Sequence, residues 1–111
     1  MEADVATRAS VILSIFDQPR ALNLSLAGYM AQSCKEFEII VADDGSDHEV
    51  AEVIERYRKM GIVPIKHVWQ ENKGYRRSKI ANTAFLKSEG EHIILTDGDC
   101  IPHHDYVKNQ L

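Results

Sequence analysis

Two aspartates separated by one glycine are the residues of this sequence best suited to bind a metal ion. Asp97, Gly98 and Asp99 directly follow the apolar run His92–Thr96. Carboxylate oxygens are preferred ligands of hard divalent cations, and magnesium-like ions commonly take one or two of them, completing their coordination with water and phosphate oxygens. Because Asp and Gly are also frequent in ordinary turns at strand ends, the triplet by itself leaves both interpretations open.

A second acidic pair, Asp43 and Asp44, follows another apolar run. A carboxylate at this point could accept a hydrogen bond from a nucleobase N–H or a ribose hydroxyl. It could instead cap the helix that we expect to begin near Asp47. Two carboxylates exceed what a turn needs, so we interpret Asp43 as structural and Asp44 as a ligand contact.

The densest group of basic residues lies at the start of the third expected helix and comprises Lys73, Arg76, Arg77 and Lys79. Cations at a helix N-terminus oppose the helix dipole, and this placement therefore favours an anion such as phosphate. The alternative is a solvated surface that neutralises Glu71. Asn82, further along the same helix, either faces the ligand or is exposed.

Several familiar sites are missing from the sequence. No GxGxxG follows the first apolar run and no GxxxxGK[ST] occurs, which argues against usual Rossmann dinucleotide binding and against P-loop phosphate binding. Adjacent side chains diverge, so we expect no joint metal role for His103, His104 and Asp105. Ser33 and the five histidines form no recognisable set of nucleophile, base and orienting group.

The elements that must position these residues alternate along the chain. Apolar runs typical of buried strands are residues 10–16, 37–42, 62–68 and 92–96, and helical spacing predicts helices from Pro19 to about Gln32, from about Asp47 to Gly61, and around Ile80–Phe85 up to about Gly90. Such alternation predicts an α/β fold, with parallel strands joined by right-handed crossovers and helices on both faces.

Ligands of open parallel sheets bind outside the carboxyl ends of the strands. Three polar clusters fall at the ends of predicted strands, namely Ser14–Asp17, Asp43–Ser46 and Asp97–Asp99, and the loop Asn72–Arg77 follows the remaining strand. We therefore expect all four to line the same edge of one sheet.

The composition is that of one small globular domain, residues 1–111, with 44% hydrophobic and 27% charged residues. The net charge of −4 argues against general nucleic-acid binding. No apolar run approaches the roughly 20 residues that cross a bilayer, and Met1–Ser10 lacks the order of a signal peptide. Cys34 and Cys100 lack metal-site spacing, so we expect reduced thiols in a cytoplasmic protein, with a peripheral place at the inner face of the membrane as an option.

The sequence resembles the family 2 glycosyltransferases, inverting enzymes with the GT-A fold. The segments that carry the resemblance are Ser10–Asp17, Glu38–Ser46, Asn72–Tyr75 and Ile94–Asp99, in matching order and spacing over nearly the whole chain. The stretches Gly74–Asn82 and Asp97–Pro102 look most like the branch of chondroitin-type and galactosyl transferases. The implied fold is a Rossmann-like GT-A half, with a mainly parallel sheet of about four strands flanked by helices.

The resemblance implies a role for each matching residue. The implied nucleotide-binding residues are Ser14, Asp44, Arg76, Arg77 and Asp97. Ser14 would lie beside the nucleotide, Asp44 would accept the N3–H of uracil, and Arg77 or Arg76 would contact the base or the diphosphate. Asp97 and Asp99 would form the DxD motif of the family, which binds the ribose and a Mn²⁺ or Mg²⁺ ion on the diphosphate.

The implied reaction is transfer of a sugar from a UDP-sugar to a saccharide-type acceptor with inversion, in the synthesis of cell-surface polysaccharides. A bound cation stabilises the negative charge that develops on the leaving diphosphate. Family members are longer than this chain, so we expect the N-terminal nucleotide-sugar-binding half, truncated at its C-terminus and inactive alone, with the catalytic base beyond Leu111. Phe16 and Asp17 replace the more frequent Tyr and Asn of the family.

Two alternatives stay open from the sequence. The first is a non-catalytic, GT-A-like interaction module, for which homo-oligomer formation is an option because half a sheet exposes an apolar edge. The second is a nucleotidyltransferase, which would want a glycine-rich basic loop after the first strand. Asp17–Arg20 offers one arginine and no glycine, which disfavours it.

Overall fold

The computed structural model of the chain describes residues 7–71 and 77–111. Strands and helices alternate as the sequence predicts, and a short helix α4, which the sequence analysis did not predict, follows them. Their bounds are β1 (Ala9–Ile15), α1 (Pro19–Met30), β2 (Phe37–Asp43), α2 (His48–Met60), β3 (Ile65–Trp69), α3 (Arg77–Leu86), β4 (His92–Asp97) and α4 (Tyr106–Gln110). Among these described residues, no helix has the length and apolar character needed to cross a membrane.

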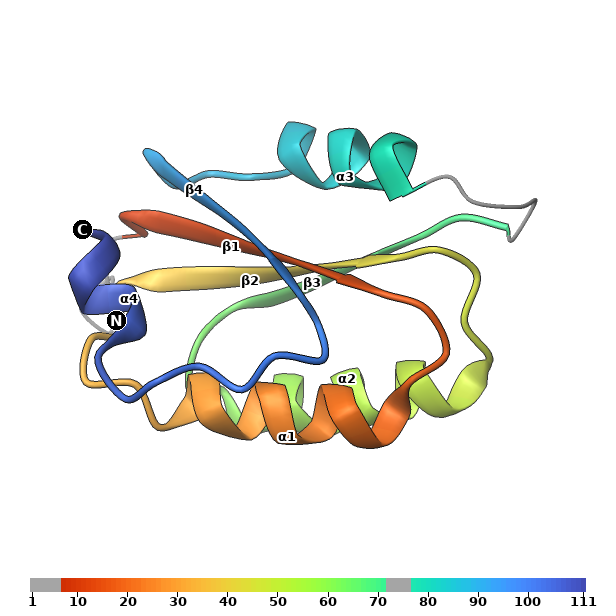
Figure 1. Cartoon of the computed structure of the whole chain (residues 1–111), viewed down its shortest axis with the longest axis horizontal. Coiled ribbons are helices and arrows are strands. Elements are labelled where there is room, and N and C mark those ends of the chain that lie inside the picture. The colour runs from red at the N-terminus through yellow and green to blue at the C-terminus, as the bar shows by residue number, and fades with distance from the viewer. Residues whose placement is uncertain (1–6, 72–76) are drawn as a thin grey trace.

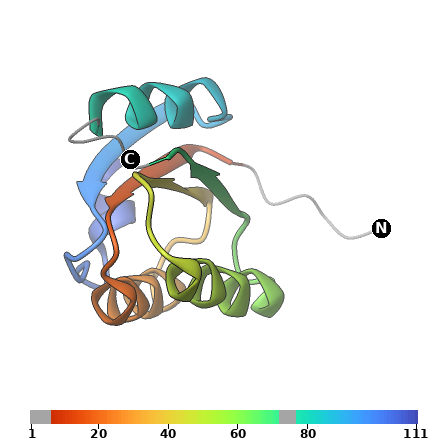
Figure 2. The same ribbon diagram turned by 90° about the vertical axis from the view of Figure 1, so that its right-hand side faces the viewer.

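The four strands form one sheet in the order β3-β2-β1-β4, and each neighbouring pair is parallel. The register places Ile12 of β1 opposite Ile40 of β2 and Leu95 of β4. The predicted α/β class and the mainly parallel sheet of about four strands are therefore confirmed. In Figure 1, β1, β2 and β3 have their carboxyl ends on the right, and β4 runs from the upper left toward the centre; the right-hand side of that view faces the viewer in Figure 2.

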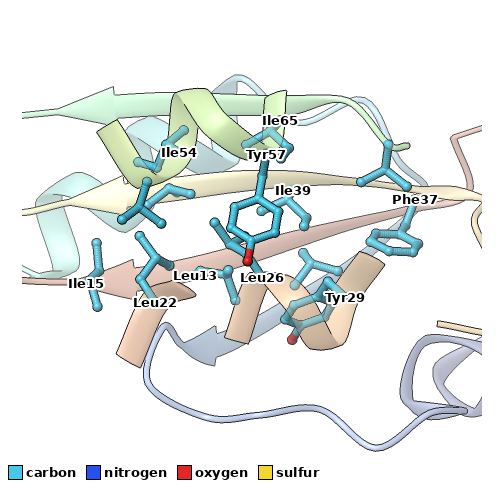
Figure 3. Packing of buried hydrophobic residues seen from close by; sticks show 14 of the residues in the cluster. Leu13, Ile15, Leu22, Leu26, Tyr29, Phe37, Ile39, Ile54, Tyr57 and Ile65 are labelled. Atoms are coloured by element: carbon cyan, nitrogen blue, oxygen red, sulfur yellow. The ribbon is translucent and has the colours of Figure 1, made fainter. Parts of the chain in front are cut away.

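Helices cover both faces of the sheet, with α1 and α2 on one face and α3 on the other (Figures 1 and 2). The larger core lies on the α1–α2 face and includes Leu13, Leu22, Leu26, Ile39, Ile54 and Tyr57 (Figure 3). A smaller cluster lies under α3 and consists of Ile12, Ile40, Ala42, Ile80 and Ala84. Because β1 and β2 are buried on both faces, they are nearly continuous apolar runs in the sequence.

The ends of two elements follow directly from proline and glycine. Gly61 ends α2 with a φ of 68°, a left-handed conformation that glycine adopts without steric cost, and its N–H donates to the carbonyl of Arg58. β3 begins at Ile65, so the predicted strand 62–68 started too early. Pro64 lacks the N–H that a ladder needs, although its carbonyl accepts a hydrogen bond from the N–H of Ile39 at 2.9 Å.

The segment that follows β4 is fixed to α1 and to the turn after it. The Ser25 hydroxyl donates to the carbonyl of Cys100 at 2.9 Å. The buried amide of Gln32 donates to the carbonyl of His103 at 2.6 Å and accepts from the N–H of Val107 at 3.0 Å. These bonds satisfy buried polar groups and fix the chain on the C-terminal side of the Asp97–Asp99 turn.

An ionic network around the buried Glu38 lies at the amino ends of the strands. Glu38 is 2% exposed, and its carboxylate accepts hydrogen bonds from the Ser10 hydroxyl at 2.6 Å and from the N–H of Glu89 at 2.7 Å. The Nζ atom of Lys66 lies 3.0 Å from Glu38 Oε1 and 2.9 Å from Glu89 Oε2. Burial raises the pKa of Glu38, but these donors together outweigh it and lower the pKa below its ordinary value.

Candidate functional site

The carboxyl ends of β1, β2 and β4 surround a pocket of about 290 Å³ beneath α3. Its walls are formed by Ser14, Ile15, Phe16, Gln18, Ala42, Asp44, Ile80, Asp97 and Asp99. The polar residues come from three strand ends that are far apart in the sequence. The structure thus brings Ser14, Asp44, Asp97 and Asp99 together at one edge of the sheet.

A backbone contact joins the acidic turn to β1. Ser14 pairs with Asp97 in the parallel register, and the N–H of Gly98 donates to the carbonyl of Ser14 at 2.7 Å. A Cβ atom at position 98 would lie 3.1 Å from that carbonyl oxygen and 3.1 Å from Cδ1 of Ile15. A side chain at position 98 would therefore crowd the end of β1, and glycine at this position permits the close approach of the turn that carries both carboxylates.

Asp97, Asp99 and Cys100 form an exposed cluster, and their ligand atoms lie within 4.8 Å of one another. Desolvation, followed by the nearby carboxylates of Asp99 and Asp97, raises the pKa of the Cys100 thiol. Thiolates are ligands of softer metals, whereas Mg²⁺ and Mn²⁺ prefer oxygen ligands. The available ligands are the two carboxylates, the number and type that Mg²⁺ and Mn²⁺ take in sites completed by water and phosphate.

Asp44 lies just beyond β2 and is 6% exposed. Its N–H donates to the carbonyl of Ile15 at 3.1 Å, which extends the β1–β2 ladder by one residue. Its Oδ1 atom accepts a hydrogen bond from Nε2 of Gln70 at 2.7 Å. Asp44 is therefore fixed by both backbone and side chain where it lines the pocket.

The preceding residue, Asp43, holds the turn together. It is 1% exposed, its Oδ1 accepts from the N–H of Ser46 at 2.9 Å, and its Oδ2 lies 2.8 Å from Nε2 of His67. The hydroxyl of Ser46 accepts from the N–H of Asp17 at 2.6 Å. These contacts agree with the structural interpretation of Asp43.

Asp17 has a positive φ of 49°. Asp and Asn are the residues other than glycine that most often adopt this left-handed conformation. Its Oδ1 also accepts from the N–H of Asp47 at 3.4 Å. The backbone conformation at position 17 is thus compatible with either Asp or Asn.

The predicted basic contacts are only partly described. Arg76 and Lys73 lie outside the described residues, and Arg77 is described only as the first residue of α3, without its side chain. Lys79 and Asn82 are exposed. The roles that we assigned to Arg76 and Arg77 therefore stay predictions.

The sequence analysis missed Gln70, whose amide binds Asp44. A glutamine after a strand belongs to no motif, and its partner is 26 positions earlier in the chain. Only the pairing of β2 with β3 could have revealed this contact. Once Asp43 is paired with Trp69, the next residue of each strand must also be adjacent.

Known protein families bear on this geometry, because a family model covers most of the chain. The model described as "Glycosyl transferase family 2" matches residues 10–111. The chain belongs to this glycosyltransferase family. The resemblance drawn from the sequence motifs is thereby confirmed.

A curated relative of this family 2 chain is the chondroitin synthase of Pasteurella multocida (strain Pm70). The two are 28% identical over 103 residues, which cover 92% of this chain and 10% of that protein. The chain therefore spans about a tenth of the length of this relative.

Solved structures of other glycosyltransferases share the fold. TarS 1–349 from S. aureus, in complex with UDP, has a TM-score of 0.84 and 26% identity, covering 93% of this chain and 30% of that chain. The mannosyltransferase PcManGT from Pyrobaculum calidifontis, in complex with GDP-Man and Mn²⁺, has a TM-score of 0.78 and 21% identity, covering 89% of this chain and 30% of that chain. The four-stranded parallel sheet and its flanking helices match these Rossmann-like GT-A enzymes.

Proposed function

We propose that this family 2 chain is the UDP-sugar-binding part of an inverting glycosyltransferase that transfers a sugar to a saccharide-type acceptor in cell-surface polysaccharide synthesis. The observation that carries the proposal is the gathering of Ser14, Asp44, Asp97 and Asp99 around one pocket. Further support comes from TarS, a solved structure with UDP at 26% identity.

In this proposal Asp97 and Asp99 hold a Mn²⁺ or Mg²⁺ ion. The fit rests on two exposed carboxylates whose oxygens lie within 4.8 Å of one another, at a pocket open to a diphosphate. When bound, such an ion stabilises the negative charge of the leaving nucleoside diphosphate. Asp97 is also the proposed ribose contact.

The proposed nucleotide contacts are those that the resemblance to the family implies, and the chemistry of each side chain suits its role. Asp44 accepts the N3–H of uracil, and Ser14 lies beside the nucleotide. Arg77, the first residue of α3, or Arg76, which precedes it in the sequence, contacts the base or the diphosphate. A carboxylate at the base distinguishes uracil, which presents an N–H at N3, from cytosine, which presents an acceptor there.

We place the catalytic base and the acceptor site in a part of the enzyme outside residues 1–111. This chain covers 10% of the length of the chondroitin synthase and 30% of TarS 1–349. These shares support a catalytic base and an acceptor site elsewhere in the enzyme. The chain alone should then bind nucleotide without turnover. The free thiols of Cys34 and Cys100 support a cytoplasmic location.

Calorimetry with UDP tests the proposal. Wild type should bind UDP with MnCl₂ and lose that binding in EDTA. Removing a hydrogen-bond partner of a metal ligand costs about 10- to 100-fold in metal affinity. Because Asp99 is itself a proposed ligand, Asp99→Asn should lower the Mn²⁺-dependent affinity for UDP by at least that factor. Glu52→Gln, an exposed change on α2 outside the pocket, should match wild type. Folded wild type that ignores UDP, or binding that Asp99→Asn leaves intact, would reject the proposal.

A non-catalytic interaction module is the second candidate. Within the described part of the chain, β4 is an edge strand of the sheet. Leu86, the last residue of α3, and Leu95 of β4 are 81% and 68% exposed. Such surfaces favour self-association. Size-exclusion chromatography with light scattering separates the two candidates, since a stable oligomer that ignores UDP supports the module and a UDP-binding monomer supports the enzyme part.

A further inference from the structure

Asp44 is hydrogen-bonded to Gln70, the residue that directly follows the neighbouring strand β3. The N–H of Gln70 donates to the carbonyl of Asp43 at 3.1 Å, and this bond continues the β2–β3 ladder past the Asp43–Trp69 pair. The backbone of Gln70 is therefore fixed beside Asp44. Its side-chain Nε2 then reaches Asp44 Oδ1 at 2.7 Å.

This hydrogen bond restricts the carboxylate in a way that matters for binding. The terminal torsion of an aspartate has a broad energy minimum, so an unrestrained carboxylate turns freely about it. The amide N–H of Gln70 can only donate, and it fixes one carboxylate oxygen as its acceptor. A group already held in its binding orientation loses less conformational freedom when the ligand arrives.

We propose that Gln70 is a positioning residue for nucleobase selectivity. It acts through Asp44, holding the carboxylate in the orientation that accepts the N3–H of uridine. This inference rests on the proposed function, in which Asp44 reads the base. The contribution of Gln70 should appear in the preference for UDP over CDP, because cytosine has no N3–H to offer the oriented carboxylate.

The test compares UDP and CDP binding to the 111-residue chain by calorimetry with MnCl₂. Gln70→Met keeps the length of the side chain and removes its N–H groups. Since one hydrogen bond contributes on the order of a 3- to 10-fold change in an equilibrium constant, UDP affinity should fall by about that factor while CDP affinity stays the same. Gln110→Met, the same exchange at an exposed position of α4, should leave both affinities unchanged.

Circular dichroism shows whether Gln70→Met is folded, and a second variant provides the test where it is not. Gln70→Glu keeps the shape and places a second acceptor against Asp44, so it should also reduce the UDP-to-CDP ratio. Equal weakening of UDP and CDP, or an unchanged ratio in a folded variant, would overturn the inference and leave the proposed function standing. Wild type without a preference for UDP would overturn the uridine assignment itself, and this inference with it.

Discussion

Gly98 and Ser14 join through their backbones, with the N–H of one donating to the carbonyl of the other at 2.7 Å. This bond attaches the turn between Asp97 and Asp99 to the end of β1, beside the loop that leads to α1. The two carboxylates are thus positioned by main-chain geometry.

Gly98→Ala should disturb this attachment. The added Cβ would lie 3.1 Å from the Ser14 carbonyl oxygen, which belongs to the central β1 strand and yields little. We expect a loss of about 1–3 kcal/mol in unfolding free energy, typical of overpacking, and weaker Mn²⁺-dependent UDP binding. Urea denaturation and calorimetry measure the two effects, and unchanged values for both would show that the turn adapts at no cost.

Asp44→Asn should alter which nucleotide the pocket prefers. The substitution replaces an acceptor oxygen by an N–H donor, which suits the acceptor N3 of cytosine and opposes the N3–H of uracil. We expect UDP affinity to fall by about tenfold, the effect of roughly one hydrogen bond, and CDP affinity to hold or rise. Asp47→Asn, the same exchange at an exposed position outside the pocket, is the control, and a UDP preference that survives in Asp44→Asn would contradict the assignment.

Glu38 should make the stability of the fold depend on acid pH. Its pKa is lower in the folded protein than its ordinary value of 4.5. The contribution of ionised Glu38 to the free energy of unfolding is therefore complete above about pH 4.5, and it is lost as the pH falls through the pKa of Glu38 in the folded protein. Chemical denaturation from pH 7 to 2 should show this decline in wild type and a smaller one in Glu38→Gln.

At neutral pH, Glu38→Gln should also lower the free energy of unfolding by about 1.5–3 kcal/mol, the range for hydrogen bonds to charged groups. Glu36→Gln is the matched control because Glu36 pairs with Arg8 while both side chains are more than 40% exposed. An exposed pair of this kind contributes roughly 0–1 kcal/mol. Equal effects of Glu38→Gln and Glu36→Gln on the free energy of unfolding would refute a stabilising role of the network around Glu38.

Two leucines of α1 test the core on the α1–α2 face. Leu26 is fully buried among the residues of Figure 3, whereas Leu24 is 55% exposed. Leu26→Ala should reduce the unfolding free energy by about 2–5 kcal/mol, as cavity-forming core substitutions do. Leu24→Ala should change it by less than about 0.5 kcal/mol, and similar values for both would mean that α1 packs differently.

The amino-acid sequence by itself determined the elements from β1 to β4 and their order, but not the short helix α4. Apolar runs such as the one centred on Ile39–Val41 are local signals, and their alternation with helical stretches leaves few topologies besides a parallel sheet. That topology places the carboxyl ends of all four strands on one edge of the sheet. The presence of Asp44 and Asp99 at the same edge could therefore be predicted, whereas the residues that each of them contacts could not.

Only the tertiary structure decided which residues support that edge. The bond from Gln70 to Asp44 depends on the pairing of β2 with β3, and the bond from Gln32 to His103 depends on the return of the chain across α1. Side-chain periodicity reveals which face of an element is buried but not which element lies beside it. Strand order and register are set by packing across the whole sheet, and for that reason these partners are found in space and not in any motif.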